Sequence, residues 1–278
     1  MTRIFMKRIE TILKKENYTF KVNEQISDGE TSQIFLGEFN NIKSIFKLSK
    51  KNKFKLIINE YFKNGIIKKI ASKNISPKVL FHDLQSELII YEYFEKDSSD
   101  LQFNNFYQLG KKLKKLHEIT PSKKIKTFEN QFNIYLNISL PELGNKYFRD
   151  AIDLLNELNV SKEKYVLCHN DLDSSNVMFK NNKIVFIDFE YLSINSKYSD
   201  LSKLIDSMNL KTLEKDKLLK GYGIHEINDS INIKIKKWSL MNIYTELIWA
   251  NYINEHKKNH FDNDYINLLK QRIKQQRQ

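Results

Sequence analysis

Residues 165–191 of the chain read YVLCHNDLDSSNVMFKNNKIVFIDFEY. The apolar run 165–168 is followed by the triplet His-Asn-Asp at 169–171, which begins a polar loop. Two short β-type runs, 176–179 and 184–187, then flank Lys-Asn-Asn-Lys at 180–183. Asparagine tolerates the left-handed backbone of a tight turn, so the pattern indicates a β-hairpin. We therefore expect Asp171, Asn176 and Asp188 to be presented by the loops that flank one small hairpin.

These three side chains suit phosphoryl transfer. Such a reaction needs a group that orients a hydroxyl, ligands for magnesium, and charges that stabilise the moving phosphoryl group. Asp171 can accept the hydroxyl proton, and Asn176 and Asp188 offer the hard oxygen ligands that magnesium prefers. The order H-x-D-x-x-x-x-N followed by I-D-F matches a kinase catalytic loop and its metal-binding aspartate. The alternative, a hairpin with solvated polar turns, would explain a lone H-x-D but not all these features in order.

The amino acids at the variable positions of the motif resemble those of one kinase group in particular. H-N-D at 169–171 and I-D-F-E-Y at 187–191 are similar to the choline and ethanolamine kinases, within the wider group that includes aminoglycoside phosphotransferases. The resemblance implies that Asp171 is the catalytic base and that His169 braces the loop by hydrogen bonding. Protein kinases would also carry an activation segment that ends in A-P-E. This chain has no such segment, which favours a small acceptor.

The N-terminal third carries candidates for nucleotide binding. Gly29, Thr31 and Ser32 lie in a turn between strand-like runs, where backbone N–H groups can cradle phosphates. The choline kinase group has G-x-T-N at this place, and this chain has G-E-T-S, so a serine replaces the asparagine. Lys47 lies in a strand that resembles the kinase segment V-A-I-K, and Glu60 in the following helix resembles its ion-pair partner. The alternative for Lys47 is a surface lysine on an edge strand.

Hydrophobic periodicity predicts the remaining elements. Strands are expected over 18–50, with turns at 28–29 and 40–41, and then over 75–81 and 87–94. Helices are expected over 5–16, 53–72, 104–119, 148–158, 201–207, 212–221, 231–256 and 262–276, with irregular chain over 121–145. The last N-terminal strand leads into a hinge, where backbone groups of Glu92 and Tyr93 are expected to meet adenine. Asp200 is expected to begin a helix, and in kinase-like folds an aspartate here also holds the catalytic loop.

The C-terminal region resembles the acceptor-binding part of the same family. Trp249 and Tyr252 are similar to a W-x-x-W pair, and Tyr265 with Arg272 resembles a D-Y…R ending. Aromatic faces and a carboxylate hold a quaternary ammonium by cation–π and charge attraction. The resemblance therefore implies a cation site with Glu190 and the catalytic aspartate as the negative groups. Its candidate rings are Trp249, Tyr252, Tyr244 and Trp238. The alternative is that aromatic residues at helical spacing pack in the core.

The composition of the chain indicates which binding partners and which cellular compartment to expect. The chain has 46 Lys and Arg against 34 Asp and Glu, a net charge of +12, but the lysines are spread from end to end. We read most of this excess as solvated surface, so neither nucleic acid nor membrane is expected as a partner. Cys168 is the one cysteine, which excludes an intramolecular disulfide. The start of the chain has no signal-peptide core, and a cytoplasmic protein is expected.

Together these patterns predict an α+β protein with a two-lobe, protein-kinase-like fold. Residues 1–95 should form a small lobe around a five-stranded antiparallel sheet, and residues 96–278 a mainly helical lobe, with ATP and Mg²⁺ between them. The expected activity is transfer of phosphate from ATP to a primary alcohol, choline or ethanolamine first. Three alternatives stay open: an aminoglycoside or other antibiotic phosphotransferase, a non-catalytic kinase-like binding module and, from charge alone, a nucleic-acid-binding protein.

Overall fold

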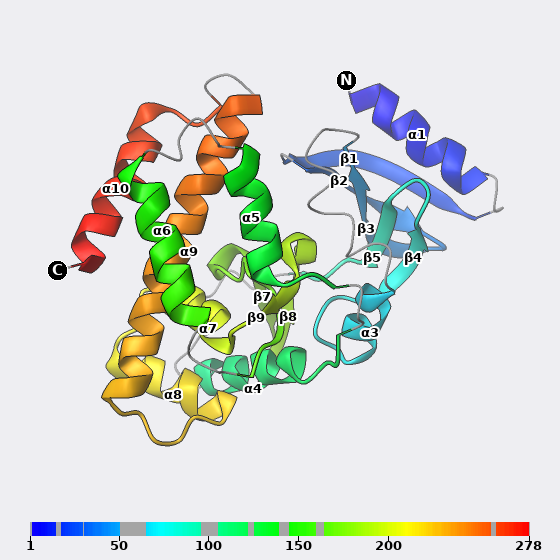
Figure 1. The fold of residues 1–278 in the computed structure, drawn as a ribbon. Coiled ribbons are helices and arrows are strands. Elements are labelled where there is room, and N and C mark those ends of the chain that lie inside the picture. The colour runs from blue at the N-terminus through cyan, green and yellow to red at the C-terminus, as the bar shows by residue number, and fades with distance from the viewer. Residues whose placement is uncertain are drawn as a thin grey trace. The chain divides into compact units, whose positions relative to one another are not determined.

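The computed structural model divides the chain into two compact units (Figure 1). The first comprises Met1–Leu101 with Asn176–Glu190, and the second comprises Gln102–Ser175 with Tyr191–Gln278. The structure describes residues 2–14, 18–29, 31–50, 65–95, 105–121, 125–138, 145–159, 164–256 and 260–277. The division at residue 95 that the sequence predicts remains a prediction about domains.

The first unit contains a five-stranded sheet with the order β1-β2-β3-β5-β4. Every neighbouring pair is antiparallel, as predicted. The turn between the second and third strands has positive φ at Asn40 (48°) and Asn41 (60°), a conformation that asparagine accepts more readily than most residues. The strands are β1 Phe20–Asp28, β2 Ser32–Phe39, β3 Ile42–Ser49, β4 Val79–Asp83 and β5 Leu88–Glu92.

Helix α1 (Thr2–Lys14) supplies apolar cover for this sheet. Its side chains Ile9 and Leu13 are fully buried in a cluster with Phe35 and Phe39 of β2 and Phe46 of β3. Residues two apart on a strand share a face of the sheet, which explains why alternate positions contribute to the cluster. Of the helix predicted over 53–72, the structure describes only its C-terminal part, α3 (Ile66–Ser72).

The predicted hairpin is confirmed and groups with the first unit. It consists of β7 (Val177–Lys180) and β8 (Lys183–Phe186). The two turn residues between them, Asn181 and Asn182, have φ of 47° and 63°, which matches the two-residue hairpin turn. Phe186 N–H donates to the carbonyl of Ile75 at 2.7 Å, which attaches the hairpin to the segment before β4.

The second unit is mainly helical, and α9 (Asp229–His256) is its longest helix. It packs against four other helices, and α10 and α6 run beside it in Figure 1. The other helices are α4 Asn105–His117, α5 Phe128–Ile138, α6 Lys146–Asn159, α7 Lys197–Ser207, α8 Thr212–Tyr222 and α10 Asn263–Arg277. A short antiparallel pair, β6 (Val166–Cys168) and β9 (Ser193–Asn195), brackets the catalytic stretch. None of the described helices is long and apolar enough to cross a bilayer.

The prediction of irregular chain over 121–145 is wrong, because α5 occupies its middle. Phe128, Phe132, Tyr135 and Leu136 recur at helical spacing and are buried. Pro121 precedes the helix and does not interrupt it, and Pro141 lies outside the described residues. The apolar spacing was therefore a better guide than the prolines, because proline disrupts a helix only in its interior.

Helices α4 and α8 approach each other closely at two glycines. A Cβ on Gly110 would lie 2.1 Å from the carbonyl oxygen of Leu218, and one on Gly221 would lie 2.0 Å from that of Tyr107. Both obstructing atoms belong to the backbone, so no side-chain rotation can relieve the overlap. The absence of a side chain at these two positions sets the distance between the helices.

We expect Gly110→Ala to destabilise the protein by about 3 kcal/mol or more, because the two helices must separate to admit the methyl group. Urea unfolding followed by circular dichroism measures the change. Lys115→Ala on the exposed face of the same helix is the control and should change stability by less than about 0.5 kcal/mol. Equal stability of Gly110→Ala and the wild type would contradict this close packing.

Candidate active site

Lys47 of β3 lies at the centre of a buried charge cluster in the first unit. Its side chain is 8% exposed and forms ion pairs with Asp188 and, at 2.5 Å, with Glu190. Burial alone would lower the pKa of Lys47, but the two carboxylates raise it well above its ordinary value. Lys47 therefore carries its charge at neutral pH, and it is not the surface lysine that the alternative interpretation proposed.

Glu190 connects this cluster to the predicted phosphate loop. The hydroxyl of Thr31 donates to Glu190 Oε2 at 2.5 Å, and Ser32 Oγ lies 3.4 Å from Oε1. Burial raises the pKa of Glu190, and Asp188 adds to this effect while Lys47 opposes it. Gly29 precedes these residues at the end of β1, and Glu60 lies outside the described residues. In the described part of the first unit, Lys47 thus takes its carboxylate partners from the segment after the hairpin.

A mainly apolar cavity of about 390 Å³ adjoins Lys47 within the first unit. It is lined by Ile26, Ile34, Ile45, Lys47, Ser76, Pro77, Tyr91–Phe94, Met178 and Phe186–Phe189. Glu92 and Tyr93 are among these residues, as the nucleotide prediction requires. Their backbone N–H groups already donate to the carbonyls of Lys78 and Lys43 at 2.9 and 2.8 Å. Apolar walls beside a lysine and two carboxylates suit a flat base attached to charged phosphates.

The hairpin brings Asn176 and Asp188 to the same end. Val177 pairs with Phe186, and Ile187 N–H donates to the carbonyl of Asn176 at 3.0 Å. Asp188 follows directly, in left-handed backbone with φ of 68°. An amide oxygen and carboxylate oxygens at one end of a hairpin are the donor set that Mg²⁺ prefers, so these residues fit that ion.

The predicted catalytic loop, residues 169–171 of the second unit, is held by the carboxylate of Asp200, which is fully buried. This carboxylate accepts the backbone N–H of His169 at 2.7 Å and that of Asn170 at 2.8 Å. It also contacts His117 Nε2 at 3.0 Å, and His117 Nδ1 lies 2.8 Å from the hydroxyl of Tyr222. The loop backbone that carries Asp171 is thus held from behind by one carboxylate.

Asp200 does not begin its helix. The N-cap of α7 is Ser196, whose hydroxyl accepts from Tyr198 N–H, and Asp200 lies within the first turn. Burial alone would raise the pKa of Asp200, but hydrogen bonds from His117 and from the N–H of His169 hold that pKa below its ordinary value. The expected contact with the catalytic loop is confirmed, and the expectation that Asp200 is the first residue of the helix is wrong.

Asn170 explains why this loop reads H-N-D. Its φ is 62°, the left-handed region that asparagine tolerates. Its amide donates to the carbonyl of Tyr191 at 3.0 Å and to Ser193 Oγ at 2.7 Å, and its oxygen accepts from Asn195 at 2.7 Å. These bonds tie Asn170, the residue directly before Asp171, to β9 and the segment that precedes it. His169 itself is fully buried and is held through its backbone N–H, and a bracing role for its side chain stays a prediction.

Asp171 lines a separate cavity of about 240 Å³ that lies wholly within the second unit. The cavity is lined by Phe128, Gln131, Tyr135, Asn170, Asp171, Asp173, Tyr191, Lys203, Asn242, Thr245, Glu246, Trp249 and Tyr265. Trp249 is therefore brought together with Asp171, as the acceptor hypothesis requires. The rings of Trp249 and Tyr265 form the aromatic wall of this cavity. The ring centroids of Trp249 and Phe261 are 5.2 Å apart, and Phe261 stacks on Tyr265 with centroids 5.0 Å apart, so Phe261 supports both rings of the wall.

The structure does not bring the other acceptor candidates to this cavity. Trp238 is buried against Phe128 with ring centroids 6.0 Å apart. Tyr252 is buried against Tyr135, and Tyr244 is fully buried. These three rings belong to the core, which is the ordinary role of aromatic residues at helical spacing. Glu190 lies in the first unit on Lys47 and does not line the cavity.

Glu246 is a carboxylate of this cavity that sequence reasoning missed, and Asp173 is another. The hydroxyl of Tyr265 donates to it at 2.6 Å, and burial together with this bond raises the pKa of Tyr265. Lys203 and Arg272 form looser ion pairs with Glu246, at 3.7 and 3.8 Å. A signal was present in the sequence, because Glu246 precedes Trp249 by one helical turn and shares its helix face.

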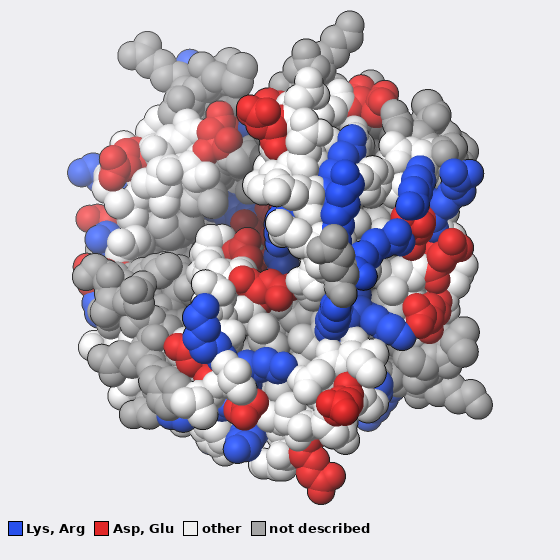
Figure 2. All heavy atoms as spheres, turned by 90° about the vertical axis from the view of Figure 1, so that its left-hand side faces the viewer, with Lys and Arg blue, Asp and Glu red and all other residues white. Residues whose placement is uncertain are grey.

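Figure 2 shows lysine, arginine, aspartate and glutamate side chains on the one face it displays. Several of the basic side chains lie next to one another right of the centre of this view, with acidic side chains around them. That the net charge of +12 is mostly solvated surface stays a prediction.

Comparison with known proteins identifies the family of the chain. The family model "Choline/ethanolamine kinase" matches residues 1–212. A relative named Protein LicA homolog, from Mycoplasma capricolum subsp. capricolum, is 30% identical over 142 residues, which cover 49% of this chain. The match spans 57% of that relative's length.

Two solved structures share the fold. The choline kinase LicA from Streptococcus pneumoniae superposes with a TM-score of 0.75 at 18% identity, covering 99% of this chain and 98% of LicA. A spectinomycin phosphotransferase, solved with ADP and spectinomycin, superposes with a TM-score of 0.62 at 17% identity, covering 94% of this chain and 92% of the enzyme. The predicted protein-kinase-like fold is therefore confirmed, with an antiparallel N-terminal sheet followed by a mainly helical C-terminal part.

We expect Asp200→Asn to destabilise the protein by about 3 kcal/mol at pH 7, because His117 and the catalytic-loop N–H groups lose their charged partner. Since the pKa of Asp200 is lowered in the folded state, its contribution is present above the unfolded-state pKa near about 3.9 and is lost as the pH falls through the folded pKa. The difference in the free energy of unfolding between the wild type and Asp200→Asn should therefore become smaller below about pH 4. Urea unfolding at several pH values measures it, with Asp153→Asn on the exposed face of α6 as the control. A stability difference between the two proteins that stays the same at low pH would show that the charge of the Asp200 carboxylate is not its cause.

Proposed function

The chain belongs to the choline/ethanolamine kinase family, and from this premise we propose that it transfers the γ-phosphoryl group of ATP to the hydroxyl of a small amino alcohol, choline or ethanolamine. One observation supports the proposal above all. Asp171, the predicted base, opens onto a small cavity whose walls include Trp249, Tyr265 and the carboxylate of Glu246. Aromatic faces with a nearby carboxylate are the chemistry that recognises an organic ammonium.

The first unit supplies the groups for nucleotide binding. Lys47 would neutralise the α- and β-phosphates, and the loop at Gly29, Thr31 and Ser32 would offer backbone N–H groups to them. The apolar cavity beside Lys47 would receive the base, next to Glu92 and Tyr93. A bound nucleotide would compete with Asp188 and Glu190 for the ammonium of Lys47, since all three groups are now in contact.

Asn176 and Asp188 would hold magnesium. The ion would supply positive charge to the phosphate oxygens during transfer. Glu190 lies beside Asp188 on the same lysine, and we assign it to this nucleotide cluster instead of the ammonium site that the sequence had suggested.

The second unit supplies the acceptor chemistry. Asp171 would orient the hydroxyl and accept its proton as the oxygen attacks the phosphorus. Asp200 holds the backbone N–H groups of His169 and Asn170, and His117 in turn contacts Asp200, so the backbone beside Asp171 is fixed. Asn170 plays a similar supporting role through its amide.

The antibiotic-kinase alternative has less support from this cavity. Its volume of about 240 Å³ is below the ~300–1,000 Å³ typical of sites for drug-sized ligands. A multi-ring antibiotic would have to extend well beyond it. The alternative of a non-catalytic binding module is disfavoured because Lys47, Asp171, Asn176 and Asp188 are all present.

We expect ATP consumption with choline or ethanolamine when a panel of these two alcohols, thiamine, sugars and aminoglycosides is tested. Asp171→Asn should lower kcat by about 10²-fold or more with little change in ATP affinity, because only the proton acceptor is removed. Asp216→Asn on α8 is the matched control for loss of one negative charge. Phosphorylation of an aminoglycoside but of neither amino alcohol would overturn the proposed acceptor. Normal turnover by Asp171→Asn would overturn the proposed base.

The two tryptophans of the chain provide a matched test of the aromatic wall. Trp249→Ala should raise the KM for choline about tenfold, the loss of one ring's cation–π attraction, and leave the KM for ATP nearly unchanged. Trp238→Ala removes a core ring and should cost about 3–5 kcal/mol of stability without a selective effect on the choline KM. Steady-state kinetics with thermal melting separate the two effects. If Trp249→Ala only lowers the melting temperature, its ring does not contact the acceptor.

A further inference from the structure

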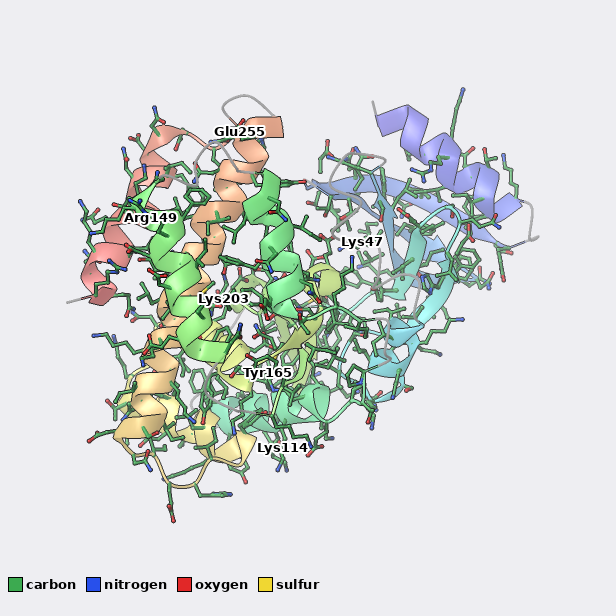
Figure 3. The ribbon with its side chains drawn as sticks, viewed as in Figure 1. Lys47, Lys114, Arg149, Tyr165, Lys203 and Glu255 are labelled. Carbon is green, nitrogen blue, oxygen red and sulfur yellow. The ribbon has the colours of Figure 1, made fainter. Side chains whose placement is uncertain are left out.

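Lys203 contributes a positive charge to the cavity that Asp171 lines. It projects from α7 and is labelled in Figure 3. Its Nζ lies 3.8 Å from Asp171 Oδ1 and 3.7 Å from Glu246 Oε2, and its side chain is only 21% exposed. One ammonium therefore bridges the predicted base and the carboxylate of the aromatic wall.

Its position follows from that of Asp200. Lys203 lies three residues after Asp200 on α7, so the contact that holds the catalytic loop also places Lys203 beside that loop. A lysine on a helix can usually extend its ammonium into water. Here the ammonium instead lies on two carboxylates inside a cavity, which is the place that a cationic acceptor would occupy.

Glu246 has further partners besides Lys203. Tyr265 donates a hydrogen bond to it, and Arg272 lies 3.8 Å away. The attraction that this carboxylate offers to a substrate cation is thus already partly compensated by protein groups. Two ammonium ions within a few ångströms of each other repel strongly in a partly desolvated cavity.

We propose that Lys203 is a specificity-determining residue, an internal counter-cation that opposes a charged acceptor at Asp171 and Glu246. The inference rests on the proposed function in taking this cavity as the acceptor site. Lys203 lowers the affinity for a fixed positive charge and leaves the affinity for an uncharged alcohol of the same shape nearly unaffected. The aromatic rings and the carboxylates attract the charge of an acceptor, and Lys203 reduces how much affinity the acceptor gains from that charge.

The test uses choline and its uncharged isostere, 3,3-dimethylbutan-1-ol, as probes of equal shape. Calorimetry gives the Kd of each for the wild type and for Lys203→Met, which keeps the length of the side chain and removes its charge. Choline should bind Lys203→Met about tenfold more tightly than it binds the wild type, and the isostere should change by less than about twofold. Lys203→Arg keeps the charge and should behave as the wild type within about threefold.

Lys237→Met is the control, because Lys237 forms an ion pair with Glu157 at 2.6 Å and does not line the cavity. It should change neither Kd, which excludes an effect of net charge alone. The inference is overturned if Lys203→Met binds choline no more tightly than the wild type, if both probes change by the same factor, or if neither probe binds to either protein. A melting temperature of Lys203→Met within a few degrees of the wild type excludes unfolding as the cause.

Binding is measured separately from turnover, so the two proposals can fail independently. If choline binds more tightly to Lys203→Met but the wild type phosphorylates neither choline nor ethanolamine, the proposed function fails and the role of Lys203 stands. If the wild type phosphorylates choline and the variant shows no selective gain, the role of Lys203 fails and the function stands.

Discussion

The arrangement of the second unit depends on one buried carboxylate. Asp200 is fully inaccessible, yet it accepts two backbone N–H groups of the catalytic loop and contacts a histidine that is itself held by Tyr222. A carboxylate in such a place is stable only while all its partners are present. Because α7 carries it, the same contact determines where that helix begins relative to the loop. The positions of Asp171, the proposed base, and of Lys203 then follow from Asp200, which does not line the cavity.

Each unit contains a poorly exposed lysine between two carboxylates. In the first, Lys47 lies on Asp188 and Glu190, with one pair at 2.5 Å and almost no exposure. In the second, Lys203 lies on Asp171 and Glu246 at 3.7–3.8 Å with more exposure. Close contact and burial make the first cluster a strongly held set, whereas the looser second set can be rearranged at lower cost. This difference matches the proposed roles, a constant cosubstrate in one unit and selection among alcohols in the other.

Most features that the sequence predicted correctly depend on residues that are close together in the chain. The hairpin, its Asn-Asn turn, Lys47 and the catalytic triplet are each specified by residues close together in the chain, and the structure places them as expected. Glu246, Tyr265 and Lys203 come from three helices, and their meeting with Asp171 depends on tertiary packing that no spacing rule contains. Trp238, Tyr244 and Tyr252 show the converse, because helical spacing alone does not say which face of a helix is core. Glu60 falls outside the described residues, and its proposed pairing with Lys47 stays a prediction.

The hairpin has a consequence for the order in which the protein can form. The first unit takes its last members from Asn176–Glu190, after a long segment that belongs to the second unit. A nascent chain that has emerged only as far as residue 101 contains Lys47 but neither of the carboxylates that accompany it in the finished protein. Burying that lysine without them would be unfavourable, so the charge cluster around Lys47 cannot be completed early in translation. Neither unit corresponds to a contiguous fragment, and this cluster can be completed only after residue 190 has emerged from the ribosome.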